Sequence, residues 1–312
     1  MNLIDHYQPE FYRRFEAAQV RCDCPGCQNG DESWPKVSVK MKNQQRDTLN
    51  LGCERAAREI LLNPDAFILH TQQGAAESDK LLSLWDETLN QQCINLVVHP
   101  ALNPQTALYA IGILLSKAQQ YLDREQHDAA LLVAISEELM QLADNGILAE
   151  QFAQLPAIEK YRVAALKALS SLDLQLDLPL AEKLGFALKQ SELSVMSEAR
   201  LAEMLSELEA IELQIDLLNE KAWIMRNILI YQLYSGVFPG VGCKDYGKAF
   251  LNLAHRLFQL RTLFALWVSA KGTLNDDHLV MLISAAEQGL SEEEPISGYE
   301  ENESLLCGLA LL

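Results

Sequence analysis

Three cysteines lie within six positions of one another in the stretch VRCDCPGCQNG, residues 20–30. They are Cys22, Cys24 and Cys27, and the Pro25-Gly26 pair bends the chain between the last two. Cysteine sulfurs that converge on one point can bind a tetrahedral zinc ion or an iron–sulfur cluster, and each of these groups usually takes four ligands. The stretch therefore supplies three ligands and needs a fourth from elsewhere.

Cys53 is the expected fourth ligand. Apolar residues alternate with polar ones over residues 37–41 and again over 49–51, and the polar stretch NQQRDT connects the two segments. This pattern predicts a small β-hairpin, which would bring the end of its second strand, and with it Cys53, beside the first three cysteines. The alternative is a set of surface thiols without a metal, because the spacing matches no strict zinc signature.

The other motifs indicate no reaction. Cys93, Cys243 and Cys307 are isolated and are expected to pack in the core as small apolar residues. The six histidines form no close pair, and His255, among apolar neighbours, is expected to be a core residue. The glycine-rich stretch FPGVGCKDYG, residues 238–247, is expected to connect two helices, since no strand precedes it. The sequence therefore identifies no catalytic residue and no cofactor-binding residue.

The elements that would position the cysteines are mainly helical. One helix is predicted over residues 53–63, where an Asn-Pro pair ends it, and another begins at Asn103-Pro104. A third spans 128–144 and ends at Asn145-Gly146. Further helices are predicted over residues 158–172, 180–189, 197–218, 221–234, 246–270 and 276–288. The expected fold is mainly α, a multi-helical body with a small N-terminal Cys-rich module that contains the hairpin, and everything after the hairpin is expected to be helical.

Three segments follow from this pattern. Residues 1–70 form the Cys-rich N-terminal module, residues 71–290 the helical domain and residues 291–312 an acidic C-terminal tail. The tail begins with SEEEPISGYEENES, which holds six glutamates and no basic residue and is expected to be solvated. The last residues, LLCGLALL, are expected to dock on the body or to pack in an oligomer.

Composition narrows the class of protein. A chain of 312 residues that is 49% hydrophobic can bury a large core. Its 25 basic and 43 acidic residues give a net charge of -18, which disfavours nucleic acid as a partner. No apolar run approaches the ~20 residues of a membrane span and no export signal is evident, so a soluble cytoplasmic protein with reduced cysteines is expected.

Three passages resemble a known family, the flagellin lysine-N-methylases of bacteria. The first is QPEFYRRF followed by the clustered cysteines, and the second is RDTLNLGCERAAREILLNPDAF, residues 46–67. The third is WIMRNILIYQLYSGVFPG, residues 223–240, with the helical segments that follow it. The chain resembles a short, divergent member that lacks part of the N-terminal cysteine region.

This resemblance implies a cytoplasmic enzyme that methylates lysine side chains of flagellin with S-adenosylmethionine and whose cysteines hold an iron–sulfur cluster. Cys22, Cys24, Cys27 and Cys53 match the cysteine regions of the family. Two other classes remain open. The chain could be a non-catalytic helical protein that binds flagellin or another export substrate, or a helical scaffold whose cysteines are incidental. Its oligomeric state is left open.

A substrate-binding surface is predicted on the best-matched helix. Arg226, Asn227, Tyr231 and Tyr234 lie there and could line a site. The alternative is a helix face with ordinary polar contacts.

Overall fold

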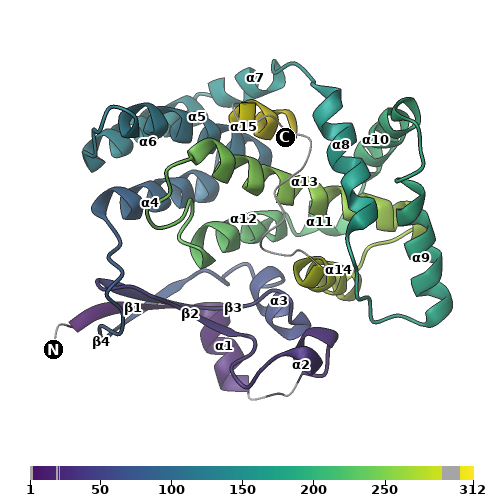
Figure 1. The fold of residues 1–312 in the computed structure, drawn as a ribbon, viewed down its shortest axis with the longest axis horizontal. Coiled ribbons are helices and arrows are strands. Elements are labelled where there is room, and N and C mark those ends of the chain that lie inside the picture. Colours follow the sequence, from purple (N-terminus) through teal and green to yellow (C-terminus); the bar gives the residue numbers. More distant parts are fainter. Residues whose placement is uncertain (1–2, 19, 21, 290–302) are drawn as a thin grey trace.

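The computed structural model describes residues 3–18, 20, 22–289 and 303–312. A four-stranded sheet with the order β2-β3-β1-β4 lies at one end of the molecule, and helices form the rest (Figure 1). The strands are β1 (Leu3–Pro9), β2 (Lys36–Lys40), β3 (Gln44–Leu49) and β4 (Leu69–Ala75). The mainly α fold with a small N-terminal module is confirmed.

The predicted hairpin is present, with β2 antiparallel to β3. Its second strand begins earlier than expected, because most of the NQQRDT stretch belongs to β3 rather than to the connection. β1 pairs with β3 in parallel and with β4 in antiparallel fashion. The expectation that only helices follow the hairpin is therefore wrong for β4, whose backbone completes the sheet beside β1.

Three short helices complete the N-terminal module, which we define as residues 3–75. They are α1 (Glu10–Ala18), α2 (Pro25–Asn29) and α3 (Glu54–Leu61). α1 packs on α3, and Phe11 and Phe15 are the side chains of α1 that are buried. α3 in turn packs against the body, where it meets α12 (Trp223–Ser235) and α14 (Asp276–Gly289).

The helical body, residues 84–289 and 303–312, is arranged around the long helix α13 (Tyr246–Lys271) (Figure 1). Most side chains of α13 are buried, since it packs against α5, α8, α9, α10, α14 and α15. The remaining helices of the body are α4 (Leu84–Val98), α5 (Pro104–Leu122), α6 (Ala129–Asp144), α7 (Ile147–Ala153), α8 (Glu159–Ala168), the 3₁₀ turn η1 (Leu169–Ser171), α9 (Leu180–Glu192), α10 (Glu198–Glu212), α11 (Asp216–Glu220) and α15 (Ser304–Ala310).

The helix ends follow from side-chain chemistry that the sequence shows. Asn103 accepts a hydrogen bond from the backbone N–H of Thr106 at the start of α5, and Asp128 accepts one from Ala130 at the start of α6. Gly146, the second residue after α6, has a φ of 74°, the left-handed conformation that glycine adopts freely. These three predicted boundaries are confirmed.

The single helix predicted over residues 197–218 is wrong. α10 ends at Glu212 and α11 begins at Asp216. At the break, the side-chain amide of Asn219 donates to the carbonyl of Leu213, which satisfies a group that a continuous helix would have bonded internally.

The C-terminal end of the chain lies against the body. α15 packs on α13, where Phe250 comes so close to Gly308 that a Cβ atom at residue 308 would lie 2.7 Å from the ring. Tyr161 donates a hydrogen bond of 2.6 Å to the carboxylate of Glu303. The segment LLCGLALL thus docks on the body, whereas most of the acidic stretch predicted to be solvated lies outside the described residues. Within the part of the chain that is described, no helix combines the length and apolarity that crossing a membrane requires.

Candidate metal centre

The four cysteines of the predicted ligand set lie together. Cys24 directly precedes α2, Cys27 lies within it, and Cys53 directly precedes α3. The sulfurs of Cys22, Cys24, Cys27 and Cys53 all lie within 4.8 Å of one another, and Cys27 Sγ is 3.4 Å from Cys53 Sγ. Cys24 and Cys53 are buried, and the other two are half-buried. The hairpin therefore brings residue 53 to the loop, as its position in the sequence predicts.

The thiols of this cluster differ in pKa, so one of them carries negative charge more readily than its neighbours. A hydrogen bond from Cys53, with further N–H groups of Glu54 and Cys27, lowers the pKa of Cys24 to about 4. Burial raises the pKa of Cys27 to about 12. The same hydrogen bond to Cys24 and burial raise the pKa of Cys53. Cys24 is thus the preferred thiolate, beside thiols that a metal ion would deprotonate on binding.

The carbonyl oxygen of Gly52 connects the cluster to the body. Ser284 Oγ and Gln288 Nε2, both on α14, donate to this oxygen at 2.7 Å each. α2 approaches the same oxygen, since a Cβ atom at Gly26 would lie 2.2 Å from it. Glycine at residue 26 is therefore required for the close approach of α2 to the residue before Cys53.

These contacts of α14 are not visible in the sequence. The helix itself is predicted over residues 276–288, but nothing in its pattern indicates that Ser284 and Gln288 reach the N-terminal module. The structure adds both residues to the surroundings of the candidate metal centre.

The four polar residues predicted on α12 lie mostly inside the protein. Asn227 donates to the carbonyls of Ile60 and Asn63 at 2.9 Å each, at the C-terminal end of α3. Tyr234 donates to the carbonyls of Tyr7 and Asp47 in the sheet.

The other two residues of this set also have internal surroundings. Arg226 donates to the carbonyl of Leu102 at 3.4 Å, and burial raises the pKa of Tyr231. The bond of Arg226 stays within the body, whereas the bonds of Asn227 and Tyr234 join the body to the N-terminal module. A role of the four residues in binding substrate stays a prediction.

A second polar cluster, on the sheet, was not predicted. His6 Nε2 lies 2.6 Å from Asp47 Oδ2, and Gln8 and Ser38 also donate to this carboxylate. Burial alone would raise the pKa of Asp47, but the hydrogen bonds from Ser38, Gln8 and Gln45 lower it below its usual value. The carboxylate is thus held ionised by neighbours on three strands. The sequence signal for this cluster is the run of consecutive polar residues in β3, residues 44–48.

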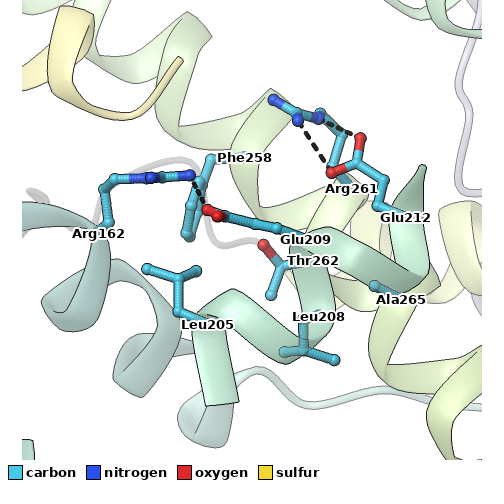
Figure 2. Close-up of a pocket in the computed structure, with 9 residues that line it drawn as sticks. All are labelled: Arg162, Leu205, Leu208, Glu209, Glu212, Phe258, Arg261, Thr262 and Ala265. Atoms are coloured by element: carbon cyan, nitrogen blue, oxygen red, sulfur yellow. Dashed lines mark hydrogen bonds and ion pairs between the residues drawn. The ribbon is translucent and has the colours of Figure 1, made fainter. Parts of the chain in front are cut away.

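Figure 2 shows a narrow pocket between α8, α10 and α13. Arg162 pairs with Glu209, and Arg261 forms a two-bond ion pair with Glu212 at 2.5 and 2.9 Å. The charges that face this pocket are therefore matched within the protein. One pair joins α8 to α10 and the other joins α10 to α13, and the pairs offer no unmatched cation to an anionic ligand.

The isolated residues behave largely as their surroundings in the sequence predict. Cys93 and Cys307 are buried, and Cys243 is half-buried in the connection between α12 and α13. Burial lowers the pKa of His255 to about 4, so this histidine is neutral at pH 7. The glycine-rich stretch forms the connection between helices that was predicted, and Gly242 donates its N–H to Asp86 there.

The fold and the cysteine cluster define a mainly helical protein with a candidate metal centre at the junction of two regions. Residues 90–293 match the family model described as the FliB lysine N-methylase C-terminal domain. Because the match covers well over half of the chain, the protein belongs to this family.

Two curated relatives support the assignment. The chain is 24% identical over 262 residues to the lysine-N-methylase of Salmonella choleraesuis and 23% identical over 261 residues to that of Salmonella typhimurium. Each alignment covers 80% of this chain and 65% of the relative, so the chain spans about two thirds of their length. No solved structure matches the chain.

Proposed function

We propose that this protein transfers methyl groups from S-adenosylmethionine to lysine side chains of flagellin in the cytoplasm. The observation that carries the proposal is the family match over residues 90–293, together with two relatives named lysine-N-methylase. Flagellin and S-adenosylmethionine are the substrate and methyl donor that the resemblance in the N-terminal and C-terminal passages implies.

The chemistry sets two requirements. A free lysine has a pKa of about 10.4, so the protein must remove a proton from the ammonium group before the amine can attack the methyl carbon. It must also align the amine with the sulfonium of the donor, since orientation supplies much of the rate. The net charge of -18 favours the approach of a cationic side chain.

Methyl transfer can be measured directly. The purified chain, incubated with flagellin and S-adenosylmethionine labelled on its methyl group, should place label on flagellin lysines. Flagellin in which lysines have been chemically blocked is the matched control and should stay unlabelled. Intact flagellin that binds the protein but acquires no label would refute the enzymatic proposal.

A second candidate is a non-catalytic protein that binds flagellin or another export substrate. The internal use of Asn227 and Tyr234 favours it, because these polar side chains of the best-matched helix donate their hydrogen bonds to backbone carbonyls of the N-terminal module. The same experiment separates the two candidates, since binding without labelling supports only the second.

We also propose that Cys22, Cys24, Cys27 and Cys53 bind a metal. The mutual approach of their sulfurs within 4.8 Å supports this, and the kind of metal group is treated next.

A further inference from the structure

We infer that Cys22, Cys24, Cys27 and Cys53 bind one tetrahedral Zn²⁺ ion and not a [4Fe–4S] cluster. The inference rests on the proposed metal binding at these cysteines and specifies the group that they bind. It also gives that ion a structural role, because the ion ties α2 to α3 and takes no part in methyl transfer.

The spacing of the sulfurs fits a single ion. A Zn–S bond is about 2.3 Å, so two sulfurs of one tetrahedron lie about 3.8 Å apart. The four sulfurs here lie within 4.8 Å of one another, and the Cys27 and Cys53 sulfurs are 3.4 Å apart. Small shifts of the side chains are enough to complete the tetrahedron.

The same spacing does not fit a [4Fe–4S] cluster. Each cysteine sulfur then binds a different iron and points away from the centre of the cluster, which places the sulfurs roughly 6 Å apart. Every sulfur pair in this set is closer than that. A cluster would therefore require the four side chains to move outward from one another.

Hydrogen bonds oppose such a movement at two of the four ligands. The carbonyl of Cys24 accepts the N–H groups of Cys27 and Gln28, which fixes Cys24 at the start of α2. Gly52, the residue before Cys53, is held by Ser284 and Gln288 of α14. Moving Cys24 and Cys53 apart would disturb these bonds as well as the close approach of Gly26 to Gly52.

The ligand set also determines what the ion can do. Four thiolates occupy all four positions of tetrahedral zinc, so no position is open for water or a substrate. Cys53 is fully buried and Cys24 is 6% exposed, which further limits access. A closed site of this kind stabilises a fold, and the methyl-transfer chemistry must take place elsewhere.

Metal and sulfide analysis of the full chain, purified without oxygen, tests the inference. We expect about one zinc per chain, no acid-labile sulfide and a colourless protein. Replacing zinc by Co²⁺ should give the intense visible absorption of a tetrahedral thiolate site. Cys53→Ser and the milder change at a half-buried ligand, Cys22→Ser, should each lower zinc content at least several-fold, while Cys243→Ser should retain it.

Other outcomes would overturn the inference. A brown protein with several irons and labile sulfide would contradict the single ion, and a chain that binds no metal under reducing conditions would contradict the site. One iron without sulfide would rule out zinc. None of these measurements depends on methyl transfer, so a failure of the proposed function leaves their interpretation unchanged. Circular dichroism of both serine variants identifies a loss of zinc that results only from unfolding.

Discussion

The N-terminal module and the helical body bury different kinds of side chain. In the body, α13 buries large apolar residues, among them Phe250, Phe264 and Trp267. In the module, the buried residues of β3 include Gln44, Arg46, Asp47 and Thr48. The body is therefore stabilised by apolar packing that depends on volume, whereas the module depends on paired polar groups and on its cysteines.

The polar groups of the module have specific partners in the body. Arg46 donates to Asn90 of α4, whose own amide donates to the carbonyls of Leu233 and Phe238. Burying polar groups costs free energy unless they are hydrogen-bonded, so these partners are what allows the sheet to lie against the helices. We therefore predict that the module loses stability when a single hydrogen bond or cysteine ligand is removed. The body should lose stability when a large buried side chain is shortened.

The largest effect is expected from removal of the zinc ion that we propose. For a structural zinc ion the apparent binding free energy at pH 7 is on the order of 10 kcal/mol, and it stabilises only the folded form. A strong chelator should therefore unfold α2 and the start of α3, while α13 stays folded. Hydrogen exchange followed by mass spectrometry resolves the two regions, and equal loss of protection in both would contradict the contrast between them.

The stability of the body should fall most when a substitution leaves a cavity in its core. Phe264 is fully buried in α13, and Phe264→Ala should cost about 3–5 kcal/mol through lost burial and the space left behind. Urea unfolding followed by circular dichroism measures this change. Leu180→Ala is the control, because Leu180 is 72% exposed and should change stability by less than about 0.5 kcal/mol.

Acid should weaken the body through His255. The pKa of this buried histidine is about 4 in the folded protein and about 6.5 when unfolded, so the unfolded chain binds more protons below pH 6.5. Its contribution is complete above pH 6.5 and is lost as the pH falls to 4, by roughly 3 kcal/mol in all. Unfolding free energies at several pH values should show a flatter profile for His255→Gln, and parallel profiles would contradict this assignment.

A smaller loss of stability is expected where α12 of the body meets the end of α3 in the N-terminal module. Asn227→Ala removes both donors to the end of α3 and should cost about 1–3 kcal/mol, because the carbonyls of Ile60 and Asn63 lose their partner. Arg226→Ala on the same helix is the control, since the hydrogen bond of Arg226 to the carbonyl of Leu102 is long, at 3.4 Å. Equal urea midpoints for the two variants would contradict a stabilising role of the Asn227 hydrogen bonds.

Two glycines give effects of opposite sign, and the effect at Gly185 is the smallest that we expect. Gly26→Ala should destabilise the module, because its Cβ would lie 2.2 Å from the Gly52 oxygen. Gly185→Ala in α9 meets nothing within 4 Å and should stabilise the body by about 0.4–1 kcal/mol. Thermal unfolding of both variants checks the signs, and a shift in the same direction would contradict the packing described for Gly26.

The sequence predicts elements well where burial is apolar. The helices α5, α6 and α13 carry apolar stripes and clear caps. The predicted start of α5 and the predicted bounds of α6 and α13 lie close to the observed ones. β3 was only half recognised, because its buried residues are polar and give no apolar alternation. β1 and β4 were missed for the same reason, since sequences such as LIDHYQP and LHTQQGA mix polar side chains on both faces. α4 was missed because it buries polar residues, including Asn90, on a helix without a simple apolar stripe.

The cysteine set could be predicted because three of its members are local and a short hairpin delivers the fourth. The support around it could not be predicted. Ser284 lies 232 residues from Gly52, whose carbonyl it bonds, and no spacing rule connects such distant positions. The positions of Asn227 and Tyr234 likewise depend on how α12 packs against the module, which helical periodicity does not determine.

X-ray absorption at the metal edge of the purified full chain tests the central claim most directly, that the module is assembled around one ion. We expect a single shell of four sulfur neighbours at about 2.3 Å and no second metal nearby. A metal–metal distance in the spectrum, or a first shell with water in place of one sulfur, would contradict a closed single-ion centre.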